Sequence, residues 1–209
     1  MAYDLQEQES LDELKAWWEK WGNATLTAVT AVCLAFAGYN GMKWYDRHQA
    51  ENASMAYSSL QSAIAAQQEV TSVDKIVNAL IDDAGSTVYG PMGALSAAKY
   101  FETKGEDAKA ETLLKWVVNE AGYTEYQTVA RLRLAGFQMD QKKYDDAIAS
   151  LTAAKPTDKQ VALVQDRLGD AYFAKNDLKA ARAAWEDALK HPLEPSLMGF
   201  VQLKLQALP

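Results

Sequence analysis

An uncharged stretch, Gly22 to Met42, lies between Lys20 and Lys43. As a helix, these 21 residues would extend about 31 Å, which matches the hydrocarbon core of a bilayer, about 30 Å thick. Tryptophan and tyrosine flank both ends, as in the aromatic belts of membrane spans; they are Trp17, Trp18, Trp21, Tyr39, Trp44 and Tyr45. The pattern predicts a transmembrane helix over residues 22–43. It separates a short acidic and amphipathic segment, residues 1–21, from the long remainder of the chain, residues 44–209.

Three other interpretations of this stretch are a buried core helix, a cleaved signal peptide and a lipoprotein signal. A soluble core helix is rarely uncharged over 21 residues. Ala35-Phe36-Ala37 has the form of a cleavage site, but a signal peptide begins with a short, positive segment. Here the preceding residues are acidic, with two lysines against six acids: Asp4, Glu7, Glu9, Asp12, Glu13 and Glu19. A lipoprotein signal would end at Cys33, where Val32 is larger than the usual small residue. An uncleaved span is therefore favoured.

Small residues recur four apart along the predicted span. Such pairs allow a second membrane helix to approach closely. The residues expected to make this contact are Ala24, Ala28, Ala31, Ala35, Ala37 and Gly41.

Apolar residues keep a helical spacing outside the span as well. Before it, Ser10 and Glu13 form a capping-box pattern, which indicates either a separate amphipathic helix or an early start of the membrane helix. After it, residues 44–90 predict a helical neck and a divergent first helix pair, residues 51–68 and 73–83. Gly85 and the pair Gly90-Pro91 indicate the connection that follows. No segment shows the alternation typical of strands.

A repeat begins near residue 91. Its copies align on Ala110, Ala147 and Ala181, which are 37 and 34 residues apart. In each copy the aligned alanine lies in the second helix, after the turn. A pair of residues in the first helix marks the same copy: Ala97-Ala98, Leu134-Ala135 and Leu168-Gly169. This pattern resembles the tetratricopeptide repeat, a helix-turn-helix unit of about 34 residues. The second copy departs from it, since Gln138 stands where a tyrosine is usual.

The resemblance implies an all-α fold: one N-terminal transmembrane helix followed by a tetratricopeptide-repeat-like α-solenoid. Residues 91–209 would hold three repeats and a C-terminal capping helix, residues 196–208.

Charge and chemistry exclude several classes of function. The net charge of −7 is opposite to that expected of a nucleic-acid-binding protein. The two histidines, His48 and His191, have no metal-ligand spacing, and no nucleophile elbow or phosphate-binding loop is present. The single cysteine lies in the span, so no intrachain disulfide forms. We therefore expect no enzymatic activity, metal or cofactor.

Over nearly its full length the chain resembles the bacterial family of ancillary SecYEG translocon subunits. The most specific segments are 131–135 (RLRLA) and 169–186, which runs from Gly169-Asp170-Ala171 to Trp185-Glu186. The resemblance implies a single-pass inner-membrane protein with a cytoplasmic N-terminus and periplasmic repeats. Lysine and arginine are balanced on the two sides of the span, so the charges do not indicate the orientation. The implied partners are SecYEG, a membrane-anchored periplasmic chaperone of the peptidyl-prolyl isomerase type, and exported or unfolded polypeptides.

The repeat register predicts a partner-binding groove. In stacked repeats the first helix of each unit lines the concave side, and mixed apolar and charged groups suit a loosely held peptide. The predicted lining residues are Met92, Leu95, Lys99, Glu102, Val129, Leu132, Met139, Asp166, Asp170 and Phe173. Two other functions stay open: an envelope scaffold for cell division or wall synthesis, and an adaptor that sequesters a response regulator through residues 1–22.

Overall fold

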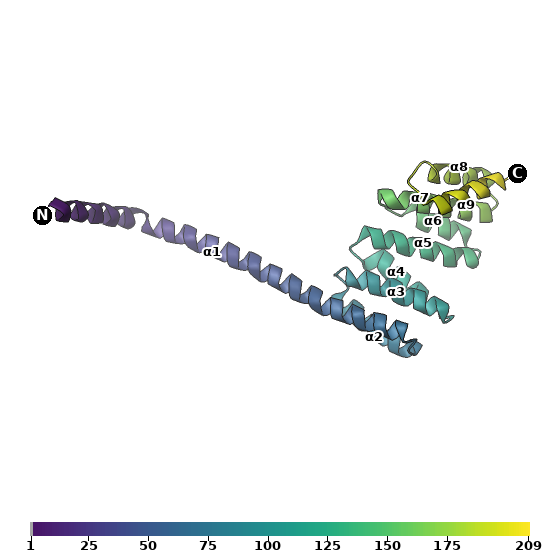
Figure 1. Ribbon diagram of the computed structural model, residues 1–209, viewed down its shortest axis with the longest axis horizontal. Helices are drawn as coiled ribbons and strands as arrows, with labels where there is room; N and C mark the ends of the chain where they lie inside the picture. Colours follow the sequence, from purple (N-terminus) through teal and green to yellow (C-terminus); the bar gives the residue numbers. More distant parts are fainter. Residues whose placement is uncertain (1) are drawn as a thin grey trace. The chain divides into compact units, whose positions relative to one another are not determined.

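The computed structural model describes the backbone of residues 2–209 and the side chains of residues 10–45 and 47–209. This part of the chain is all-helical, as the sequence predicted, and contains no strand (Figure 1). Its helices are α1 (Ala2–Ala65), α2 (Val70–Ala84), α3 (Tyr89–Thr103), α4 (Asp107–Glu120), α5 (Thr124–Asp140), α6 (Tyr144–Thr152), α7 (Asp158–Ala174), α8 (Leu178–Ala188) and α9 (Pro195–Gln206). The chain divides into two compact units, Met1–Gln49 and Ala50–Pro209.

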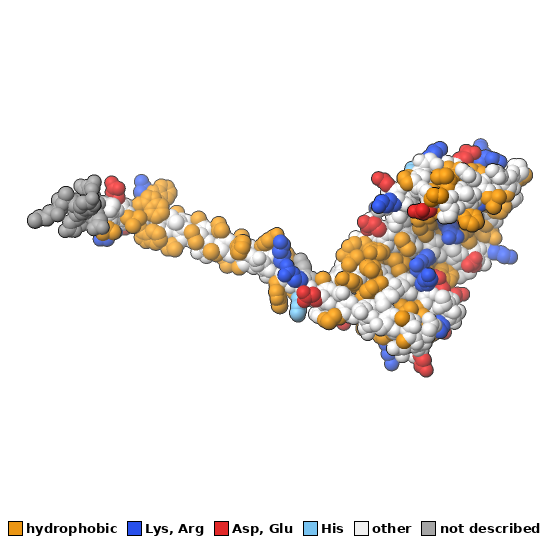
Figure 2. Space-filling view, in the orientation of Figure 1, with side chains coloured by type: hydrophobic (Ala, Val, Ile, Leu, Met, Phe, Trp, Pro, Cys, Tyr) orange, Lys and Arg blue, Asp and Glu red, His pale blue; other side chains and the backbone are white. Residues whose placement is uncertain are grey.

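The first unit is the N-terminal part of α1, and its apolar side chains contact almost nothing. Leu34 and Phe36 are 68% and 70% exposed, and uncharged, largely apolar atoms surround this part of the helix (Figure 2). Among the described residues α1 alone is long and apolar enough to cross a membrane. A core helix of a soluble protein would be covered by neighbouring elements, whereas the large apolar side chains of this helix are exposed. That surface fits a single membrane span.

The N-terminal segment differs in one respect from the prediction. α1 already begins at Ala2, so Ser10 lies inside the helix and does not cap a new one. The continuous helix corresponds to the early start that the sequence left open. The side chains of Asp4, Glu7 and Glu9 lie outside the described residues.

The second unit stacks helix pairs on the end of α1. The C-terminal turns of α1 contribute Ala53 and Leu60 to a core shared with α2, α3, α4 and the start of α5. A second core joins α5, α6, α7 and α8, and a third joins α8 to α9. Each helix contacts its neighbours in the chain from α2 onward, and α5 also contacts α3 and α7. This stacking places α3, α5 and α7, the first helices of three successive pairs, side by side (Figure 1).

The turns inside the three pairs confirm the repeat. Each first helix ends with a residue at positive φ: Gly105 (74°), Lys142 (59°) and Asn176 (69°). In each turn the following N–H donates to a carbonyl five residues back: Glu106 to Phe101, Lys143 to Gln138 and Asp177 to Tyr172. This is the Schellman C-cap, which satisfies the last free carbonyls of a helix. The same termination recurs at intervals of 37 and 34 residues, which shows that the units are structural repeats, although their sequences differ.

One boundary prediction was wrong. Gly90-Pro91 lies in the first turn of α3 and not in the connection before it. Proline is tolerated in a first turn because its missing N–H has no helical acceptor there. Gly90 has a close neighbour, since a Cβ at this position would lie 2.7 Å from Cα of Gly85. Close packing of the connection on the helix thus explains this glycine.

Candidate partner-binding groove

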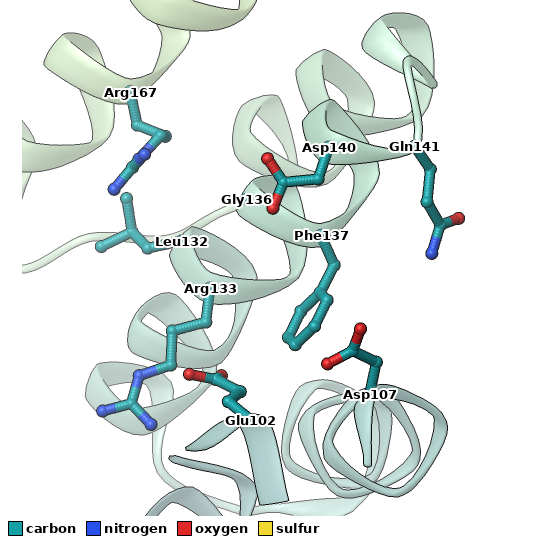
Figure 3. Close-up of a pocket in the computed structure, with 9 residues that line it drawn as sticks. All are labelled: Glu102, Asp107, Leu132, Arg133, Gly136, Phe137, Asp140, Gln141 and Arg167. Atoms are coloured by element: carbon teal, nitrogen blue, oxygen red, sulfur yellow. The ribbon is translucent and has the colours of Figure 1, made fainter. Parts of the chain in front are cut away.

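A pocket of about 640 Å³ opens between the first helices of the three repeats. α5 forms its floor, α3 and the start of α4 form one wall, and α7 contributes to the opposite end (Figure 3). We call this pocket the groove; its lining residues are Glu102, Asp107, Leu132, Arg133, Gly136, Phe137, Asp140, Gln141 and Arg167. Its volume lies within the range of ligand pockets, about 300–1,000 Å³.

The floor consists of one face of α5. Leu132, Gly136 and Asp140 follow one another at four-residue intervals, so they line up along the helix. Phe137 packs against the core of the first pairs and is only partly buried there. Gly136 leaves the floor open, because a Cβ added to it would meet no atom within 4 Å. The groove therefore combines an aromatic surface with free space beside it.

The charged side chains of the groove differ in their bonding. Arg133 donates a hydrogen bond of 2.8 Å from its guanidinium to the backbone carbonyl of Leu95, and its end points away from Phe137 (Figure 3). Arg167 points toward Leu132 at the α7 end. The side chains of Glu102, Asp107 and Asp140 form no hydrogen bond or ion pair within the described part of the chain. The three carboxylates of the groove are thus available to a partner, and Asp107 lies beside the Phe137 ring.

The structure brings two of the ten predicted residues into this groove, Glu102 and Leu132. Leu95 is buried in the core, and Val129 and Met139 pack against the cores on either side. Lys99 lines a separate, smaller hollow with Gln61. Met92 is half-buried. The prediction that these residues bind a partner is not tested by their positions.

The predicted residues of the third repeat lie against α9. The ammonium of Lys204 contacts the carboxylates of Asp166 at 2.7 Å and Asp170 at 2.6 Å, and it lies 5.7 Å from the ring of Trp185. The indole N–H of Trp185 donates to the carbonyl of Asp166. Phe173 packs beside the same indole and is half exposed. Lys204 therefore holds the terminal helix against the first helix of the third repeat.

Burial raises the pKa of Asp166 above the ordinary range of an aspartate, and the neighbouring Asp170 adds to this, although Lys204 and Arg167 oppose it. A raised pKa in the folded protein means that folding disfavours the charged form. The charge on Asp166 therefore lowers stability above that pKa. Stability is regained as the pH falls through the folded pKa toward the ordinary value.

Asp166→Asn is accordingly expected to keep or slightly raise stability at neutral pH, although it removes one partner of an ion pair. The neutral amide avoids the burial of charge, and Asp170 still accepts from Lys204. The gain over the natural protein should shrink as the pH is lowered through the folded pKa of Asp166. Urea unfolding at several pH values measures this. A loss above about 1 kcal/mol at neutral pH would show instead that the pair is a net source of stability.

Seven groove residues were missed by the sequence reading: Asp107, Arg133, Gly136, Phe137, Asp140, Gln141 and Arg167. The sequence does indicate two of them, Gly136 and Asp140, because their four-residue spacing from Leu132 places all three on one face of a helix. Asp107 and Arg167 come from other helices, and only the stacking brings them to this face. Within residues 10–45 and 47–209, no group of His, Cys, Asp or Glu could hold a metal ion.

Known proteins resemble this chain over nearly its full length. The family model described as a tetratricopeptide repeat-like domain matches residues 15–209. A protein of Escherichia coli (strain K12) named ancillary SecYEG translocon subunit is 27% identical, covering 97% of this chain and 96% of its own length. Proteins with the same name from Haemophilus influenzae and Neisseria gonorrhoeae are each 26% identical. They cover 90% and 100% of this chain, and 91% and 100% of their own lengths.

Proposed function

Because the chain belongs to the tetratricopeptide repeat-like domain family, we propose that it is a membrane-anchored adaptor that serves as an ancillary subunit of the SecYEG translocon. Three relatives with that name align over nearly their whole lengths, including the region of the span. The repeat stack offers a binding surface between its first helices. These observations support a protein that acts by binding other proteins, and in this proposal it catalyses no reaction.

The proposed location is the bacterial inner membrane, with the N-terminus in the cytoplasm and the repeats in the periplasm. One helix that is long and apolar enough to cross a membrane, with exposed apolar side chains, supports a single span. The small residues of that span are all exposed and are proposed to contact another membrane helix. They are Ala24, Ala28, Ala31, Ala35, Ala37 and Gly41.

In this proposal the groove binds a polypeptide segment, supplied by an exported protein or by a membrane-anchored periplasmic chaperone of the peptidyl-prolyl isomerase type. The observation that carries it is the open pocket on α5, where Phe137 and Gly136 leave an aromatic surface beside unfilled space. Repeat proteins bind extended segments on such surfaces between first helices. The adaptor would then hold a chain emerging from the translocon near its chaperone.

Photo-crosslinking in cells tests this function. A photoreactive amino acid at Gln141, on the rim of the groove, is expected to capture Sec subunits, a periplasmic chaperone or exported chains. The same probe at Thr112, exposed on α4 and outside the groove, serves as the control. Mass spectrometry identifies the adducts of the full-length, membrane-bound protein.

Equal adducts from both positions would contradict binding in the groove. Adducts with wall-synthesis or division proteins alone would replace the translocon proposal with the envelope-scaffold function.

A further inference from the structure

The carboxylates of the groove lack the lysine partners that several aspartates of the same domain have on other helices. Elsewhere in the stack, a lysine forms an ion pair with an aspartate of another helix: Lys109 with Asp74, Lys175 with Asp145, and Lys204 with Asp166 and Asp170. In the groove, Glu102, Asp107 and Asp140 come from three helices and have no such lysine. The two arginines that line the groove, Arg133 and Arg167, form no ion pair with these acids in the described part of the chain.

The chemistry of the groove favours a side-chain cation over a metal ion as a ligand for these acids. The groove carboxylates are not arranged as a metal site, since no group of three or more His, Cys, Asp or Glu in residues 10–45 and 47–209 could ligate one. In addition, the Phe137 ring lies among the acids, beside Asp107 (Figure 3). An aromatic face favours a lysine or arginine, whose charged end attracts the ring and the carboxylates while its stem packs on the apolar surface.

The groove has a charge difference between its ends. The α3–α4 wall carries Glu102 and Asp107, whereas Arg167 lies at the α7 end near Leu132. Arg133 contributes little charge to the open space, because it is directed to the carbonyl of Leu95. A bound segment would therefore place its cation toward α3 and α4, with an apolar side chain over Gly136 and Phe137.

We propose that the groove selects polypeptide segments in which a lysine or arginine adjoins an apolar or aromatic residue. This inference rests on the proposed function, because it assumes that the groove binds polypeptide. It adds the chemical class of the ligand, which charge complementarity and the Phe137 surface specify together.

A peptide-binding measurement tests the inference on the full-length protein in detergent. The probes are two fluorescent peptides in an uncharged background, one with a central Leu-Lys-Phe and the other with Leu-Glu-Phe. Fluorescence anisotropy should show the lysine peptide binding about tenfold more tightly or better, since one ion-paired contact contributes on the order of a tenfold change. The preference should weaken with added salt. In the double variant E102Q/D107N the preference should largely disappear, because the two side chains of the α3–α4 wall are then uncharged.

Gly136→Trp separates failure of the inference from failure of the proposed function. The indole would fill the groove, and no atom lies within 4 Å of the position of its Cβ. Gly199→Trp is the matched control, since Gly199 also lies in a helix and has an open Cβ position. Loss of binding in Gly136→Trp alone locates the peptide in the groove.

Three results would overturn the inference. If Gly136→Trp abolishes binding but both peptides bind equally, the groove binds polypeptide without selecting a cation, and the proposed function stands. If neither peptide binds, or if Gly136→Trp binds as well as the natural protein, the groove is not the peptide site, and both proposals fail.

Discussion

Replacing Gly169 by alanine is expected to lower the free energy of unfolding of the repeat domain by about 2 kcal/mol. A Cβ at this position would lie 2.4 Å from two atoms of the Trp185 indole. The indole is rigid, only 2% exposed and hydrogen-bonded to the carbonyl of Asp166, so it has no free space to move into. Displacing it would also disturb Lys204, whose ammonium lies over the ring.

Gly136→Ala is the matched control for this prediction. The same substitution, in the equivalent helix of the neighbouring repeat, meets no atom within 4 Å. It should raise stability by up to about 1 kcal/mol, because alanine is the better helix former. Thermal and urea unfolding measure both variants. Equal effects at the two positions would show that close packing of α7 on α8 is not the reason for Gly169.

Removing residues 1–43 is expected to reduce association with the translocon about a hundredfold or more. The span confines the repeats to the layer beside the membrane, which raises their concentration near membrane partners. Folding should be almost unchanged, since the repeat unit begins at Ala50 and has its own cores. Co-purification of Sec subunits with the full-length and the shortened protein, at matched expression, measures the difference.

A third variant, with residues 22–43 replaced by an unrelated single span, distinguishes tethering from specific contacts. If tethering alone matters, this variant associates as the natural protein does. If it associates as poorly as the shortened protein, the small residues of the natural span make the contact. Equal recovery of the shortened and full-length proteins would refute the tethering argument.

The groove shows what the repeat register indicated and what it did not. The register identified the first helices, and Glu102 and Leu132 line the pocket, but partner binding by the ten named residues stays a prediction. Register alone did not separate groove residues from core residues on the same helix. Leu95 is buried in the first core and Met139 packs against the second, so neither lines the groove. The rotation of each helix in the stack decides which face remains open.

In the third repeat, the repeat register likewise did not reveal the ion pairs of two aspartates. Asp166 and Asp170 have the spacing of groove residues, but the structure pairs them with Lys204, 34 or more residues later in the chain. No local pattern indicates such a partner, since it depends on how α9 packs against the end of the stack.

The sequence by itself determined that this protein is all-helical, that an uncharged N-terminal helix suits a membrane, and that a repeat follows. These properties depend on local periodicity, on the absence of charge over 21 residues and on the similar spacing of turn and small residues. Only the tertiary structure decided which side chains line the groove and which acids lack a lysine. Those properties depend on distances between residues far apart in the chain, which the packing of α3, α5, α7 and α9 alone determines.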